Sequence, residues 1–344
     1  MLEQKIHSPE CPMPKVRWVC AAFKSFIGAA VITVIAVIAF SVSLIAVETA
    51  QAIERHKIKT LVGRATGILP WDLTELSGMA QCESTPGLIY AINDKGNEAK
   101  LYTVDEAAKM QTIYPFLEDK NKDWEDLACG KCIDSPSECV YIGDIGSNNG
   151  TRKKLTVYMV PVPILLQETK KGPSVVRTKI KLKYPNGSHN AETLLAHPKK
   201  AMLLVVTKEK GPKGKLKDPR MFQIDFTKEQ YNGDRLKLAD LGQIKMLRHL
   251  ERSDPASSSW ITGGDFHPSG DWMLLMTYTF IFRVDWPLKE LERKRVELPL
   301  FSSVDRSQIE SIAFHRNGRQ FWIASEMNRW SEPLILMELP KEGK

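Results

Sequence analysis

The chain has 344 residues, of which 43% are hydrophobic and 26% charged, and its formal net charge is +7. This is enough material for a full-sized globular domain. The basic residues are not confined to one block, and the chain has no zinc-finger spacing, RNA-binding signature or glycine-rich phosphate loop, so we expect no nucleic acid partner.

The N-terminal region has the pattern of a membrane anchor. No charge interrupts the apolar run from Phe26 to Val47, which at about 1.5 Å per residue can cross a hydrocarbon core of about 30 Å. Basic residues outnumber acidic ones before this run, which predicts a cytosolic tail over 1–24, a single transmembrane signal-anchor over 25–47 and a stalk over 48–57. Residues 58–344 would then form the ectodomain of a single-pass type II membrane protein, on the lumenal, extracellular or periplasmic side. The alternative is a signal peptide cleaved near Ala52.

The cysteines agree with export. Four of them follow the apolar run: Cys82, Cys129, Cys132 and Cys139. Cys129 and Cys132 have the spacing of a metal or redox pair, but no second pair or histidine pair completes a zinc site. In an oxidising compartment an even set predicts two disulfides. One bridge is expected to close the hairpin that leads to Cys139, and the full connectivity stays open.

Two glycosylation sequons lie in the same part of the chain. They begin at Asn149 and Asn186. In a eukaryote both asparagines would be plausible glycan acceptors, and in a bacterium the motifs would carry no meaning. The sequence therefore predicts a glycoprotein only in the first case.

A short phrase recurs five times after residue 58, each time opening an apolar strand that is followed by a turn and a second, more hydrophobic strand. The copies begin at Ser77, Glu125, Glu192, Gly264 and Glu310. A unit repeated at this scale predicts a stack or ring, because one unit cannot bury its own apolar face.

Further strands are expected after each copy of the phrase. In chain order they are 88–93, 100–105 and 110–116; 139–144, 155–160 and 175–184; 201–208, 221–226 and 236–244; 272–279, 281–285 and 294–298; 320–326 and 334–339. The last group lacks one strand, which the segment 58–68 can supply. This predicts an all-β, five-bladed β-propeller whose N-terminus completes the last blade. Six blades are the alternative, because two intervals between phrases are long.

The opening residues of the copies are candidate metal ligands. In a propeller the first strand of each blade lines the central channel, so these residues converge on the axis. The carboxylates of Glu125, Glu192 and Glu310 and the hydroxyl of Ser77 are the hard oxygen donors that Ca²⁺ prefers. Gly264 contributes no side chain, so water or a backbone carbonyl would take its place. The alternative is a wet channel lined by solvated polar side chains.

A second polar ring is expected at the same end of the channel, where the second strands end. Asp94, Asp144 and Glu326 are the candidate catalytic bases there, and Lys208 is the candidate for offsetting the charge of an anionic substrate. His189 precedes Glu192 and could be a base or a ligand, although a hydrogen-bonded loop histidine is favoured.

Three more histidines follow the first strands. His197, His267 and His315 occupy equivalent turns, which we expect at the opposite end of the ring. Basic residues instead mark the loops of the acidic end; Arg152, Lys153, Lys154, Lys210 and Lys215 are among them. An acidic centre beneath a basic rim suits an anionic ligand that approaches a bound metal.

Several motifs resemble a family of exported, mostly bacterial and largely uncharacterised β-propeller proteins. They are Leu76-Ser-Gly78, Asn93-Asp94, Asp123-Trp-Glu-Asp126, Tyr141-Ile-Gly-Asp-Ile-Gly146, His189-Asn-Ala-Glu192, Thr207-Lys208 and Thr262-Gly-Gly-Asp265. The resemblance spans about residues 70–330 and implies the propeller fold without implying an activity.

A more distant resemblance is to the calcium-activated nucleotidases, or apyrases. It rests on Glu75-Leu-Ser77 followed by Leu88-Ile-Tyr, on Trp124-Glu-x-Leu-Ala128 followed by Val140-Tyr-Ile-Gly143, and on the closing Glu310 strand. That family implies a five-bladed propeller with one Ca²⁺ in the channel, at positions that match Ser77, Glu125, Glu192 and Glu310. Gly264 stands where the family has a serine, and Thr207-Lys208 where it has an arginine pair.

Two functions follow from these patterns. The first is a binding or interaction module, in which an axial Ca²⁺ staples the blades and the channel face meets an anionic small molecule, a protein or a glycan. The alternative is a metal-dependent hydrolase of phosphate-containing, nucleotide-like anionic substrates. There the metal would polarise the substrate and orient the attacking water.

Overall fold

The computed structural model describes a large part of the predicted ectodomain. The described residues are 63–116, 119–168, 178–211, 215–226, 231, 233–247, 250, 255–288, 295–297, 308–326 and 332–339. The predicted tail, signal-anchor and stalk (1–57) and the first residues of the predicted ectodomain lie outside them. Among the described helices, none combines the length and the apolar character that a membrane crossing needs.

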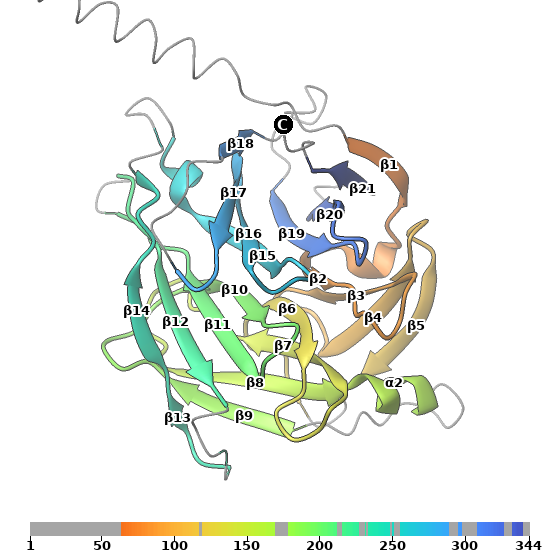
Figure 1. Ribbon diagram of the computed structural model, residues 1–344, viewed down its shortest axis with the longest axis horizontal. Helices are drawn as coiled ribbons and strands as arrows, with labels where there is room; N and C mark the ends of the chain where they lie inside the picture. The colour runs from red at the N-terminus through yellow and green to blue at the C-terminus, as the bar shows by residue number, and fades with distance from the viewer. Residues whose placement is uncertain are drawn as a thin grey trace, which may run out of the picture. The chain divides into compact units, whose positions relative to one another are not determined.

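The described chain folds into five sheets around a common axis (Figure 1). Blade 1 contains β2 (Leu76–Ala80), β3 (Leu88–Asn93), β4 (Lys100–Asp105) and β5 (Met110–Pro115); blade 2 contains β6 (Trp124–Lys131), β7 (Glu138–Asp144), β8 (Lys154–Pro161) and β9 (Thr178–Lys183). Blade 3 contains β10 (Ala191–Ala196), β11 (Met202–Thr207), β12 (Arg220–Asp225) and β14 (Ala239–Gln243); blade 4 contains β15 (Ile261–Phe266), β16 (Trp272–Thr277), β17 (Phe280–Asp285) and β18 (Arg295–Glu297). Blade 5 contains β19 (Ile309–Phe314), β20 (Gln320–Ser325) and β21 (Pro333–Glu338), and it is completed by β1 (Gly63–Ile68). The predicted five-bladed propeller is confirmed.

The N-terminal strand closes the ring. β1 pairs antiparallel with β21, with Ala65 opposite Ile335 and Ile68 opposite Pro333. Blade 5 therefore contains strands from both ends of the described chain, as predicted. Gly67 also fits tightly against blade 1, because a Cβ atom at this position would lie 1.9 Å from the backbone oxygen of Ala107.

The cores lie between blades rather than inside them. Each of five hydrophobic clusters joins two neighbouring blades, and together they run around the whole ring. The first and second strands of each blade are buried on both faces and are therefore almost continuously apolar, as in β16. An outer strand such as β9 alternates instead, with Ile180 and Leu182 buried and the lysines between them exposed.

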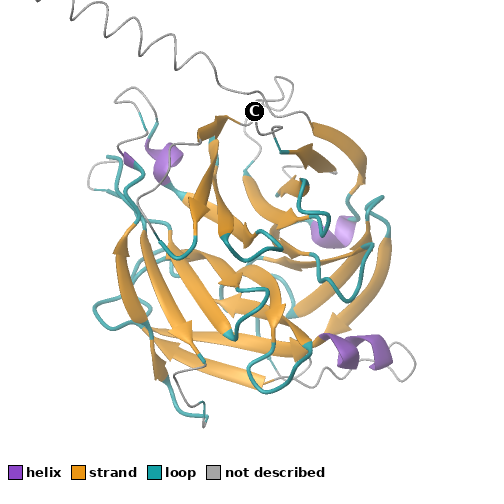
Figure 2. Cartoon of the chain, viewed as in Figure 1, coloured by secondary structure: helices purple, strands orange, loops and turns teal. Residues whose placement is uncertain are grey.

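Strands dominate the described chain, and the helical elements are short (Figure 2). They are η1 (Trp71–Leu73), α2 (Val162–Glu168) and η4 (Ala256–Ser259). The sequence predicted loops at the last two positions. In α2, Val162 and Leu165 are buried in the core between blades 1 and 2, and this burial anchors the helix to the propeller.

The prediction of a single strand over 236–244 is wrong. It divides into β13 (Leu236–Lys237) and β14, and β13 pairs in parallel with β9 of blade 2 rather than with blade 3. Leu236 and Leu238 are both buried in the core between blades 2 and 3. Because both leucines are buried there, the chain pairs with the edge of blade 2 before it forms β14 in blade 3.

Both predicted disulfides are present, and the structure settles their pairing. Cys132 and Cys139 close the β6–β7 hairpin, and Cys82 and Cys129 connect blade 1 to blade 2. Because these bridges span 47 and 7 residues, a chain-entropy estimate assigns them about 4 and about 2 kcal/mol.

We expect Cys82→Ala/Cys129→Ala to lower the free energy of unfolding more than Cys132→Ala/Cys139→Ala does. Urea unfolding of the two variants beside the unchanged protein measures the difference. An equal or smaller loss for the bridge between blades would contradict this account.

Candidate functional site

Each first strand carries a β-bulge near its start. The residue that the pairing register skips is Ser77 in β2, Glu125 in β6, Glu192 in β10, Thr262 in β15 and Glu310 in β19. These five residues, which we call the axial ring, occupy equivalent positions at the start of the innermost strands. In every blade, the bulge therefore reorients one polar side chain near the start of the first strand.

The fourth member of the axial ring is Thr262, whereas the sequence phrase predicted Gly264. Gly264 lies two residues further along β15, where a Cβ atom would come within 2.8 Å of the backbone oxygen of Leu274 and 3.0 Å of Thr193 Cγ2. Close packing thus explains the glycine. The signal in the sequence was the threonine two residues before it, Thr262.

The two hydroxyls of the axial ring each bond to the next blade. Ser77 Oγ donates to the backbone oxygen of Glu125, and Thr262 Oγ1 donates to that of Ile309 at 3.0 Å. Both hydroxyl groups therefore lie beside the start of a neighbouring first strand, which carries a glutamate of the ring.

A second ring surrounds the first. A residue just beyond the second strand folds back onto the residue two positions before the bulge. Asp94, Lys208 and Glu326 directly follow their strands, and Gly146 lies two residues beyond β7. The amides of these four residues donate to the backbone oxygens of Glu75, Asn190, Gln308 and Asp123, respectively. Tyr278 directly follows Thr277, the partner of Ile261, and so takes this place in blade 4. We call Asp94, Gly146, Lys208, Tyr278 and Glu326 the second ring.

Asp144 does not belong to this ring, although the sequence grouped it there. It pairs with Trp124 one step earlier in the ladder, and its carboxylate lies 2.7 Å from Arg152 Nη1. The structure thus brings together three of the four predicted catalytic residues (Asp94, Lys208 and Glu326) and places Asp144 in a separate ion pair.

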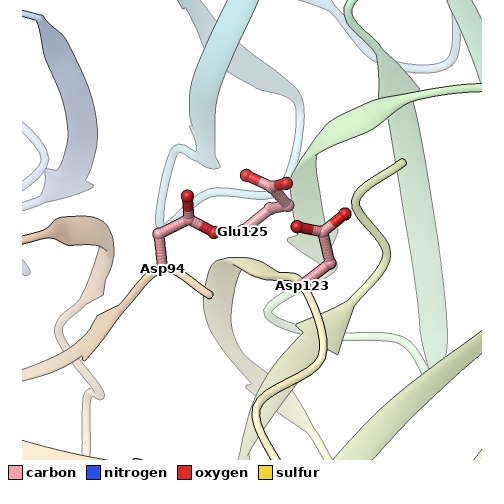
Figure 3. Close-up of side chains that lie close together, drawn as sticks. All are labelled: Asp94, Asp123 and Glu125. Carbon is pink, nitrogen blue, oxygen red and sulfur yellow. The ribbon is translucent and has the colours of Figure 1, made fainter. Parts of the chain in front are cut away.

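Asp94, Asp123 and Glu125 form an acidic cluster at the junction of blades 1 and 2. One carboxylate oxygen of each lies within 4.8 Å of the others, and Figure 3 shows Asp94 at the end of β3 with Asp123 and Glu125 opposite it. Lys95 Nζ contacts Asp123 at 2.9 Å. The sequence analysis did not name Asp123 as a site residue; its place two residues before Glu125 was the available signal.

Glu125 is poised to accept a further partner. Its side chain is only 3% exposed, and its Oε1 atom has no hydrogen-bond partner. A Cβ atom at Gly146 would lie 1.9 Å from this oxygen, so the glycine of the second ring keeps the space open. Burial, together with the carboxylates of Glu192 and Asp94, raises the pKa of Glu125 well above its usual range.

Lys208 lies between the other two glutamates of the axial ring. Its Nζ atom is 3.3 Å from Glu192 Oε2 and 3.9 Å from Glu310 Oε1, and it donates to the hydroxyl of Tyr278 at 2.9 Å. Burial alone would lower the pKa of Lys208, but the carboxylates of Glu192, Glu310 and Glu125 raise it above the ordinary value. The ammonium group is therefore the internal counterion of this side of the ring.

The two carboxylates of the second ring carry raised pKa values. Burial raises the pKa of Asp94 to about 6, with the carboxylates of Asp123 and Glu192 adding to the shift and Lys95 opposing it. Burial and the adjacent Glu310 carboxylate also raise the pKa of Glu326. Burial is the larger cause of both shifts, and the neighbouring carboxylates add to it.

The histidines lie in a loop and in turns, as the sequence predicted. His189 Nδ1 lies 3.0 Å from Glu209 Oε1, and Lys217 contacts the same carboxylate, so His189 is a hydrogen-bonded loop histidine. His197, His267 and His315 are turn residues whose Nδ1 atoms accept backbone N–H bonds two residues on.

The comparisons with known proteins assign no family. No protein-family model matches the chain, and no curated protein matches it. Solved structures that resemble it include U3-55K, with 13% identity over 77% of this chain and 68% of that chain and a TM-score of 0.39. The aldose sugar dehydrogenase of Streptomyces coelicolor in its PQQ-bound form has 10% identity over 81% and 98% and a TM-score of 0.41. The Neurospora crassa Pan2 WD40 domain has 9% identity over 78% and 64% and a TM-score of 0.32.

Proposed function

We propose that the protein is a Ca²⁺-binding, extracytoplasmic β-propeller that acts as an interaction module through the acidic end of its channel. The observation that carries the proposal is the charge balance of the two rings. Five carboxylates meet there: Asp94, Glu125, Glu192, Glu310 and Glu326. Asp123 adjoins them, and the ammonium groups that contact this group within the described residues are those of Lys95 and Lys208.

The donor set fits calcium. Ca²⁺ accepts six to eight oxygen ligands in a tolerant geometry. The carboxylates of Glu125, Glu192 and Glu310 would hold it, with the hydroxyls of Ser77 and Thr262 beside them and water in the remaining positions. The unpartnered, buried Oε1 atom of Glu125 supports this assignment, because a buried carboxylate oxygen without a partner is costly.

A bound cation would also change the role of Lys208. Its ammonium group neutralises Glu192 and Glu310, and a divalent ion between these carboxylates would take over that task. Lys208 would then be available to an anionic ligand at the channel mouth. The interaction partner that we propose is accordingly an anionic small molecule, or an acidic segment of a protein or glycan.

The compartment is part of the same proposal. Two disulfides are typical of proteins that mature in an oxidising environment. They support an extracytoplasmic propeller, and the predicted signal-anchor over 25–47 would attach it to the membrane as a type II protein. Glycans at Asn149 and Asn186 stay a prediction for a eukaryotic host.

Calorimetric titration of Ca²⁺ into the chelator-treated full chain tests the proposal. We expect one ion per chain and a higher melting temperature when calcium is present, because a ligand that binds only the folded state stabilises it. Absence of both effects would leave the glutamates as a solvated channel lining.

A metal-dependent phosphohydrolase is the second candidate function. The observation that favours it is Asp94, whose pKa of about 6 suits a general base near neutral pH and which lies beside Glu125. The metal would supply Lewis-acid chemistry, Asp94 would accept a proton from water, and Lys208 would offset phosphate charge. Glu326 was also predicted as a base, but its raised pKa keeps it protonated near neutral pH. Turnover of a nucleoside diphosphate that survives Glu125→Gln/Glu192→Gln would exclude this mechanism.

Replacing Thr262 tests the fourth position of the axial ring. Thr262→Val keeps the shape of the side chain and removes its oxygen, so we expect calcium affinity to fall about fivefold, equivalent to about 1 kcal/mol. The matched control is Thr193→Val, which removes a buried hydroxyl that has no partner. Equal affinity for the two variants in calorimetry would remove Thr262 from the calcium site.

A further inference from the structure

The outer edge of blade 2 carries a row of exposed lysines that the channel site does not use. Its members, which we call the lysine row, are Lys154 at the start of β8, Lys181 and Lys183 in β9, and Lys237 in β13. All four side chains are exposed. They come from three strands that lie side by side in one sheet, in the order β13-β9-β8.

The pairing register places these lysines on one face. Lys183 lies opposite Lys154 in the antiparallel β8–β9 pair and opposite Lys237 in the parallel β9–β13 pair. Adjacent strands are about 4.8 Å apart, and residues two positions apart on one strand are about 6.8 Å apart. Lys181 therefore extends the row along β9, and opposite it Thr156 adds a hydroxyl group.

These charges are not compensated within the described chain. None of the four ammonium groups forms a salt bridge with a described residue, whereas Lys179 on the same strand contacts Asp119 at 2.5 Å. Like charges directly opposite each other destabilise a sheet. The fold does not require them, because the opposite face of the same strands supplies the core residues Leu155, Leu182 and Leu236.

We propose that the lysine row binds a linear sulfated polysaccharide. Lysine presents a point charge on a flexible stem, which suits diffuse attraction to sulfate groups better than bidentate recognition of one group. Lysines whose backbone positions are spaced by about 5–7 Å across three strands can each direct an ammonium group to an anionic group of an extended chain. The inference rests on the extracytoplasmic placement and is independent of the calcium proposal.

An anionic membrane surface is the competing partner, and the disulfides argue against it. The leaflet that carries the strong negative surface potential is the cytoplasmic one. Bridges at Cys82–Cys129 and Cys132–Cys139 are typical of the other side of the membrane. A sulfated glycan is a polyanion that fits an extracytoplasmic placement.

Binding of the full chain to heparin, in uncharged detergent micelles, tests the proposal. The row variant carries Lys154→Gln, Lys181→Gln, Lys183→Gln and Lys237→Gln. The matched control removes the same number of charges from exposed lysines elsewhere, with Lys109→Gln, Lys131→Gln, Lys199→Gln and Lys200→Gln. We expect the row variant to bind heparin at least about tenfold more weakly at 0.15 M salt, with a shallower salt dependence, because fewer counterions are exchanged.

Two further measurements complete the test. The melting temperature of the row variant should equal or exceed that of the unchanged protein, since like-charge pairs are removed; this shows that weaker binding is not unfolding. The proposal is overturned if the control variant loses as much affinity as the row variant. It is also overturned if the unchanged protein binds phosphatidylserine vesicles but not heparin.

Discussion

Replacing Glu192 with glutamine is expected to weaken calcium binding by at least about 100-fold, because the affinity of such sites depends on the number of charged ligands. The substitution is nearly isosteric. The glutamine oxygen can still accept the hydrogen bond that Asn190 Nδ2 donates at 2.6 Å and can still face Lys208. The loss should therefore come from the missing charge rather than from a distorted channel.

Melting temperatures with and without calcium distinguish the loss of a calcium ligand from a general destabilisation of the fold. In the absence of calcium, Glu192→Gln removes both a like-charge repulsion with Glu125 and Asp94 and the attraction to Lys208, so these two effects offset and the melting temperature should change little. In its presence, the unchanged protein should gain about 2.7 kcal/mol at a calcium concentration 100 times its Kd. The variant, whose Kd is expected to be at least about 100 times larger, should gain at most about 0.4 kcal/mol at that concentration.

Calorimetry and thermal melting with and without calcium measure both effects. Glu98→Gln is the matched control, because Glu98 is an exposed carboxylate that contacts Lys100. A variant at Glu192 that binds calcium as tightly as the control would show that the axial ring does not hold the ion.

Removal of the N-terminal strand is expected to abolish the cooperative unfolding transition. A chain that starts at residue 69 lacks β1, which is paired at five positions with β21. At about 1 kcal/mol for each ladder position, the loss is on the order of 5 kcal/mol, which is comparable to the whole stability of a typical domain. The edge of blade 5 and its contact with blade 1 would both be exposed.

The matched control for this truncation starts at residue 59 and retains β1. It corresponds to the larger compact unit of the chain, Lys59–Lys344, and should melt cooperatively. Gly67→Ala offers a milder test, because the added methyl group would collide with the backbone of Ala107. We expect it to lower the melting temperature, while Arg64→Ala on the same strand should have little effect. Equal melting of the two truncated chains would contradict closure by β1.

The sequence by itself indicated the strands of the blades, favoured five blades over six and predicted how the ring closes. The central residues of strands such as β16 and β20 are all apolar because these strands are buried on both faces, and this pattern is local to each strand. The missing strand of the last group pointed to the segment before Ser77. The turn histidines and the presence of two disulfides were likewise readable, because they depend on short motifs and on cysteine number.

The tertiary structure decided the register of the site and the partners of its charges. A bulge shifts every following side chain to the other face of its strand, and packing between blades, not the apolar pattern, selects the skipped residue. For this reason Thr262 rather than Gly264 joins the axial ring, and Asp144 pairs with Arg152 outside the second ring.

The same reason applies to contacts that join different blades. Asp123 meets Asp94, Lys208 lies between Glu192 and Glu310, and Cys82 reaches Cys129 only because the ring brings separate blades together. The local sequence specified each strand, and the curvature and closure of the propeller determined which side chains meet at its axis.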